Sequence, residues 1–149
     1  MSILDIEFTV SRKVNPGDLE RVWQVLSDVR NMPRYWRGHR EVEVLRRDGN
    51  TYFVNIKFAF QGPNNRGGVA KIEVNDDGRF VVINYVRGPI RGYVKNYIDG
   101  GDTVVSQWKV KITPLFLVFK PWIRRHFMNG ASNALARIVN NETNELRLS

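Results

Sequence analysis

The sequence contains no cysteine and only two histidines among its 149 residues. Disulfides, thiolate metal sites and a cysteine nucleophile are therefore excluded, which fits a reducing compartment. Two histidines are too few for a histidine-based zinc cluster, and neither an HExxH nor a GxSxG motif occurs. We therefore predict no metal site and no cofactor.

Long apolar runs are also missing. No stretch of about 18 consecutive apolar residues occurs, so we expect no membrane-spanning helix. The first fourteen residues alternate apolar and polar side chains, unlike the continuous apolar segment of a signal peptide. The composition, 42% hydrophobic and 26% charged, is typical of a globular protein. We predict a cytoplasmic protein in which residues 1–149 form one domain.

Acidic residues are in deficit, because 15 Asp and Glu stand against 23 Lys and Arg and leave a net charge of +8. Six arginines gather between positions 30 and 47, where Glu41 and Glu43 interrupt them. Such charge serves solubility, contact with an anionic membrane or ligand, or nucleic-acid binding. We favour solubility. RNA or ribosome binding is the least favoured, since no aromatic-basic motif supports it.

The periodicity of the apolar residues predicts a strand followed by short helices. Apolar residues alternate at positions 4, 6, 8 and 10, as in a strand with one buried face. Asn15 and Pro16 suit a helix start, and apolar residues follow at 19, 22, 23 and 26, one face of a short helix. A second brief helix or turn is expected over residues 28–35, since Pro33 prevents a long continuation of the first.

The middle of the chain predicts an antiparallel meander. Strands are expected near 41–47, 51–60, 67–75, 79–87, 91–98 and 103–112, separated by segments rich in Gly, Asn and Asp. After Pro114 the apolar period becomes helical, which predicts a long helix over residues 115–146 that starts or bends at Pro121.

This order of elements resembles the START / Bet v 1-like superfamily, including its polyketide cyclase and lipid-transport branch. The segments that carry the resemblance are Leu19–Asp28, Met32–Trp36 and Val42–Leu45, similar to the "vW.vlsD...mp.w" and "vevl" patterns of these families. The resemblance implies an α+β helix-grip fold, in which a seven-stranded antiparallel sheet wraps around the long C-terminal helix. It also implies a ligand cavity between sheet and helix.

Alternation along each strand predicts which side chains face that cavity. The inward sets are 52, 54, 56, 58 and 60; 80, 82, 84 and 86; the even positions 90–98; and the even positions 104–112. Three polar residues, Asn84, Asn96 and Ser106, fall on these apolar faces. Buried polar groups cost about 1–3 kcal/mol when unpaired, so they bond one another, the backbone, water or a ligand. A two-residue turn at Gly100-Gly101 would put Lys109 inward, so we expect a longer turn or a bulge that places Asn96 near Ser106.

A candidate binding site follows from these faces and from helical spacing. Its predicted ligand-binding residues are Tyr52, Phe58, Asn84, Asn96, Ser106, Trp108, Ile123, Phe127 and Ala131. Phe119 and Trp122 are predicted to line the cavity entrance. Lys120, Arg124 and Arg125 stand among them and are candidates for contact with an anionic membrane or another anion. The competing interpretation is that this segment only closes one end of the sheet.

Three functions follow. The first is binding or carriage of a small hydrophobic ligand, such as a lipid, an isoprenoid quinone or a polycyclic compound. The second is a polyketide cyclase or aromatase type of enzyme, which needs an acid/base pair in the cavity. No Asp, Glu or His occupies a predicted inward position, and neither His39 nor His126 is expected to do chemistry, so binding is favoured over catalysis. The third is the RNA-associated protein above. The sequence leaves the oligomeric state open.

Overall fold

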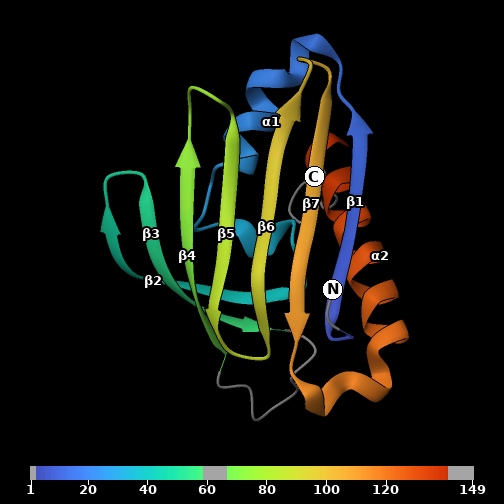
Figure 1. Cartoon of the computed structure of the whole chain (residues 1–149). Coiled ribbons are helices and arrows are strands. Elements are labelled where there is room, and N and C mark those ends of the chain that lie inside the picture. The colour runs from blue at the N-terminus through green and yellow to red at the C-terminus, as the bar shows by residue number, and fades with distance from the viewer. Residues whose placement is uncertain (1–2, 59–66, 141–149) are drawn as a thin grey trace, which may run out of the picture.

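The computed structural model describes residues 3–58 and 67–140. Seven antiparallel strands form one sheet in the order β1-β7-β6-β5-β4-β3-β2 (Figure 1). The strands are β1 (Asp5–Lys13), β2 (His39–Asp48), β3 (Thr51–Phe58), β4 (Gly68–Asn75), β5 (Phe80–Arg87), β6 (Ile90–Asp99) and β7 (Thr103–Ile112). The predicted helix-grip architecture is confirmed, and predicted inward residue Phe60 lies outside the described residues.

Helices occupy the two predicted regions. After β1 come the 3-10 turn η1 (Pro16–Asp18), helix α1 (Leu19–Leu26) and the 3-10 turn η2 (Met32–Arg34). After β7, the chain forms the 3-10 segment η4 (Pro114–Phe119) and then the long helix α2 (Lys120–Asn140), so α2 begins five residues later than predicted. Pro121 lies in the first turn of α2, where its missing N–H costs nothing. The predicted extension beyond 140 lies outside the described residues.

Helix α2 packs along β1 and β7 and is held at both ends (Figure 1). At its start, the Lys120 ammonium donates to the backbone carbonyl of Ile3 at 2.6 Å. At its end, the Arg21 guanidinium of α1 donates to the carbonyls of Ile138 and Val139 at 3.0 and 2.7 Å. These carbonyls belong to the last turn, where a cation compensates the negative end of the helix dipole.

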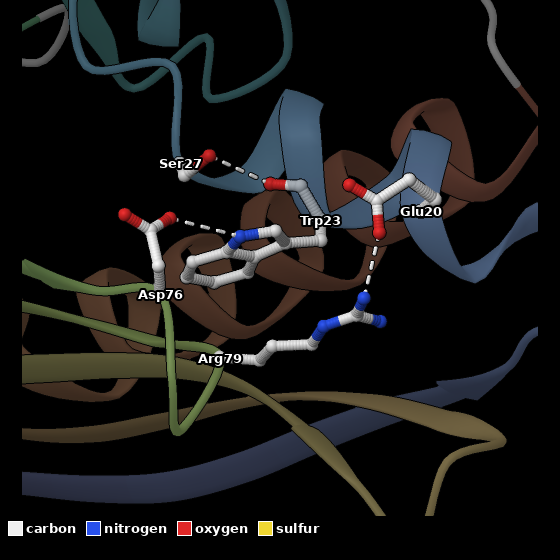
Figure 2. Close-up of polar contacts among 5 residues, drawn as sticks. All are labelled: Glu20, Trp23, Ser27, Asp76 and Arg79. Carbon is white, nitrogen blue, oxygen red and sulfur yellow. Dashed lines mark hydrogen bonds and ion pairs between the residues drawn. The ribbon is translucent and has the colours of Figure 1, made fainter.

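Helix α1 is anchored to the turn between β4 and β5 (Figure 2). The Trp23 indole N–H donates to Asp76 Oδ1 at 3.2 Å, and Arg79 Nη2 bonds Glu20 Oε2 at 2.6 Å. The Ser27 hydroxyl donates to the Trp23 carbonyl at 2.8 Å and closes the last turn of the helix. The Trp23 ring itself is buried in the core.

Replacing Asp76 with alanine should lower the free energy of unfolding by about 1–2 kcal/mol, because the buried indole N–H would lose its acceptor. Asp77→Ala, which removes the same charge from the neighbouring position of the turn, should change the free energy of unfolding by less than about 0.5 kcal/mol. Urea unfolding of the two variants measures the difference. Equal losses of unfolding free energy in the two variants would show that the turn, and not the contact with Trp23, provides the stability.

The register between β6 and β7 confirms the expected longer turn. Asp99 pairs with Thr103, so Gly100, Gly101 and Asp102 form the turn, and Asn96 pairs with Ser106. Even positions therefore oppose even positions. Asn96 and Ser106 are both buried, as predicted.

In β5 the predicted inner face is wrong. Val81, Ile83 and Tyr85 are buried, whereas Asn84 pairs with Lys71 and Tyr93 on the outer face. Both alternating sets of this strand are mostly apolar, so alternation alone does not say which one faces inward. Asn84 is therefore not available to a ligand between sheet and helix.

A β-bulge in β2 turns His39 into the core. His39 pairs with Phe58 and Glu41 pairs with Lys57, so Arg40 is an extra residue. A bulge of this kind shifts the alternation by one residue and re-aims the side chain. His39 is 5% exposed, although it lies among the arginines of residues 30–47 and before the strand predicted near 41–47.

Candidate functional site

A cavity of about 290 Å³ lies between the sheet and α2. Its apolar walls come from the segment before β2, from three strands and from the helix. They are Trp36, Phe58, Ile90, Trp108, Phe127 and Ala131, all of them buried. An apolar cavity of about 150 Å³ accepts benzene. The present cavity therefore has room for about two aromatic rings.

The cavity opens to solvent along one stripe of α2. His126, Gly130, Asn133 and Arg137 follow one another at helical spacing and line the cavity opposite the Trp36–His39 segment. The first three are exposed. At one end of this mouth, Arg137 Nη1 donates to the Tyr35 carbonyl at 2.9 Å and links the helix to the opposite rim.

Gly130 lies at the mouth in the interior of α2. Glycine there costs about 1 kcal/mol relative to alanine. A Cβ at this position would meet no atom of another segment within 4 Å, so close packing does not require glycine. Its effect on the described structure is to leave the mouth without a side chain.

Ring stacking fixes the Trp108 wall. Its ring stacks on Phe8 at a centroid distance of 5.2 Å and contacts Phe127 at 5.4 Å. Its indole N–H donates to Ser106 Oγ at 2.9 Å. Because two neighbouring rings and a hydrogen bond hold it, Trp108 forms a preorganised part of the cavity wall.

A histidine-tyrosine pair forms the polar part of the wall. His39 lines the cavity, and its Nε2 lies 2.6 Å from the Tyr85 hydroxyl oxygen. Tyr85 pairs with Ala70 on one side and Gly92 on the other, which are small residues that leave space for its ring. Burial lowers the pKa of His39 to about 4 and raises the pKa of Tyr85 above its usual value. At neutral pH the imidazole is uncharged and the tyrosine keeps its proton.

Residues 16–97, more than half of the chain, match the family model "Polyketide cyclase / dehydrase and lipid transport". The chain belongs to this family. The START / Bet v 1-like relationship expected from the sequence is thus confirmed. Comparison of the sequence with curated proteins gives no match.

Solved structures share the family fold at low identity. A Thermus thermophilus protein aligns with a TM-score of 0.70 and 15% identity over 91% of this chain and 94% of its own. The Zhui aromatase/cyclase from a Streptomyces species aligns with a TM-score of 0.65 and 18% identity over 97% of this chain and 95% of its own. The STAR-related lipid transfer protein from Xanthomonas axonopodis aligns with a TM-score of 0.62 and 12% identity over 89% of this chain and 85% of its own. At these identities the similarity shows the fold alone.

Four of the predicted binding residues of this family member line the cavity. They are Phe58, Trp108, Phe127 and Ala131. Ser106 acts behind the wall, through its bond with the Trp108 indole. Tyr52, Asn96 and Ile123 are not part of the cavity lining, and Arg47 lies over the Tyr52 ring at 4.8 Å. Contact of any of these residues with a ligand stays a prediction.

The predicted entrance residues lie where η4 passes into α2. Phe119 and Trp122 are 58% and 57% exposed. Trp122 stacks on His126 at 5.1 Å, and His126 lines the mouth, whereas Phe119 does not border the cavity. Arg124 and Arg125 are exposed, and Lys120 is half-buried beside Ile3. The His126 ring therefore lies between Trp122 and the cavity.

Sequence reasoning missed the polar wall. His39 was assigned to a loop and Tyr85 to the outer face, and the bulge at Arg40 and the doubly apolar β5 explain both errors. The statement that no histidine faces inward is therefore overturned. Among the described residues, no group of three or more His, Asp or Glu could hold a metal ion, and no helix is long and apolar enough to cross a membrane.

Proposed function

We propose that this protein binds and carries a compact hydrophobic molecule of about two rings, the size that the cavity volume allows. The observation that carries the proposal is the cavity itself, an apolar space of about 290 Å³ where a protein of this size otherwise packs solidly. Flat aromatic walls at Trp36, Trp108 and Phe127 suit a flat ring system. Among lipids, quinones and polycyclic compounds, the volume favours the polycyclic class.

Blocking the mouth tests this function. Gly130→Phe should keep the fold, because a Cβ fits there and phenylalanine is a better helix former than glycine. It should weaken binding of a fluorescent two-ring probe such as 2-naphthol at least tenfold. Ser132→Phe adds the same ring to an exposed position of α2 outside the cavity lining and is the matched control.

Fluorescence titration of both variants and the wild type gives the affinities, and mass spectrometry of organic extracts gives the natural occupant. Unchanged probe affinity in Gly130→Phe would place binding elsewhere. If the wild type binds no hydrophobic probe and its organic extract contains no bound molecule, the proposal is wrong.

A cyclase or aromatase type of enzyme is the second candidate, and the His39–Tyr85 pair favours it. The imidazole in the cavity wall is uncharged and, with a pKa of about 4, a weak base, so its contribution would be to polarise a bound carbonyl oxygen while the tyrosine beside it orients the ring. Conversion of a bound polyketone into a dehydrated ring product, followed by mass spectrometry and lost in His39→Phe, would favour the enzyme over the carrier.

We also propose that the end of η4 and the start of α2 contact anionic membrane surfaces. Val118, Phe119 and Trp122 are exposed apolar residues, and Arg124 and Arg125 are exposed beside them. Rings of this kind enter the headgroup boundary while cations meet anionic lipid, at about 1 kcal/mol for each basic residue.

Reversing the charge of Arg124 and Arg125 together should lower binding to phosphatidylserine vesicles by at least about 30-fold, because the loss of two such contacts alone implies that factor. Vesicle co-sedimentation at low and moderate salt measures the change. Arg12→Glu with Lys13→Glu, at the far end of β1, is the charge-matched control. Equal losses in both double variants would indicate a general charge effect.

A further inference from the structure

One buried polar atom in the cavity wall has no partner. His39 Nδ1 makes no hydrogen bond to any described residue, although the side chain is 5% exposed and the other ring nitrogen is bonded to Tyr85. A buried donor or acceptor left without a partner is costly, and native structures rarely keep one without a reason. His39 is a cavity-lining residue, and because Nδ1 itself is closed to water, a bound molecule would reach it only after a small shift of the wall.

The tyrosine determines which kind of atom Nδ1 presents. Tyr85 is protonated, and the bond to His39 is the one described contact of its hydroxyl. If the hydroxyl donates to Nε2, its proton is satisfied, and neutral imidazole then carries its own proton on Nδ1. The opposite arrangement would leave the buried tyrosine proton without an acceptor. The hydrogen-bond count therefore favours a histidine with a free Nδ1–H donor.

Two neighbouring rings hold this donor in place. His39 lies 5.7 Å from the Phe58 ring and 5.9 Å from the Tyr85 ring, and Phe58 and Tyr85 are themselves 5.9 Å apart. Register pairing fixes the His39–Phe58 neighbourhood in the backbone. A donor fixed among apolar walls such as Phe58 and Trp108 is a typical specificity element, because apolar walls provide affinity and a buried polar group selects the ligand.

We propose that the His39 Nδ1–H group donates a hydrogen bond to an oxygen of the bound molecule, so that the protein selects ring compounds bearing a carbonyl or similar acceptor over plain hydrocarbons. This inference rests on the proposed cavity function and names its ligand class. The ligand oxygen accepts the bond that the protein leaves unmade, while Trp108 and Phe127 contact the rings.

A matched pair of probes tests the selection. Tetralin and 1-tetralone share a two-ring skeleton of the size that the cavity allows, and only the second has a carbonyl oxygen. The wild type should bind 1-tetralone about tenfold more tightly than tetralin after correction for their different solubilities, the effect of one buried hydrogen bond. His39→Phe should lose this preference and keep the affinity for tetralin.

Tyr85→Phe provides a second variant. It removes the acceptor-donor pairing that fixes the imidazole proton on Nδ1, so the preference for 1-tetralone should fall, though less than in His39→Phe. In the wild type, imidazole nitrogen NMR should show the Nδ1 resonance of His39 shifting with 1-tetralone and not with tetralin. This measurement uses the wild type alone, so it does not depend on whether a variant folds.

The outcomes separate the two proposals. Equal wild-type affinity for both probes, or a preference that persists in both variants, would overturn the role of His39 while leaving the cavity function intact. Binding of neither probe to the wild type would overturn the cavity function. A Nδ1 resonance that ignores 1-tetralone would also exclude the proposed hydrogen bond.

Discussion

Replacing Gly92 with alanine should lower the free energy of unfolding by about 4 kcal/mol, from backbone strain of ~1–3 kcal/mol together with a steric clash. Gly92 lies in β6 with a φ of +109°, a conformation that side chains rarely adopt. A Cβ there would stand 2.3 Å from the Lys109 carbonyl oxygen and 2.9 Å from the Val110 Cα. Both obstacles are backbone atoms of β7 and cannot rotate away.

Gly101→Ala is the control, because Gly101 also has a positive φ of +77° but no atom within 4 Å of an added Cβ. It isolates the conformational cost and should lose about 1–2 kcal/mol. Urea unfolding compares the two variants. Since Gly92 pairs with Tyr85, Gly92→Ala should also disturb the hydroxyl contact with His39. Equal losses in both variants would mean that the sheet yields easily at this bend.

Acidification from pH 7 to pH 5 should destabilise the protein by about 2 kcal/mol through His39 alone. Burial lowers the pKa of His39 to about 4 in the folded state, against 6.5 for the ordinary group. The unfolded chain therefore binds the proton first. Stability from this residue is complete above about pH 6.5 and is lost as the pH falls toward 4.

The chain provides its own control for this effect. His126 is the second of the two histidines and is exposed on α2. Urea unfolding at several pH values should show that His39→Phe loses most of the pH dependence between 7 and 5, whereas His126→Gln keeps it. If both variants keep the dependence, other groups cause it.

Most of the fold was predictable because the turns and the alternation agree. The even positions of β7, from Val104 to Ile112, are buried as predicted, because lysines at 109 and 111 mark the outer face clearly. In β5 no charged residue marks either face between Phe80 and Val86, and the prediction chose the wrong one. Where a strand is apolar on both faces, tertiary packing decides its orientation.

The candidate site was predictable only in part. Alternation found Phe58 and Trp108, and helical spacing found Phe127 and Ala131. His39 required knowledge of the bulge at Arg40, and bulges have no reliable signal in a single sequence. The cavity itself was implied by family resemblance alone, since apolar residues that surround a space look the same in sequence as those that fill it.

The clamps at the two ends of α2 bear on how fast a ligand exchanges. Lys120 ties the start of the helix to Ile3, and Arg21 ties its end to α1, while the mouth lies between them. Because both ends of α2 are held, we expect a ligand to enter through the mouth without movement of the helix. Among the side chains at the mouth, Asn133 is exposed and its rotamers interconvert within nanoseconds, while His126 stacks on Trp122. The observed association rate in stopped-flow experiments should therefore rise linearly with ligand concentration, without the plateau that a slow opening step would impose.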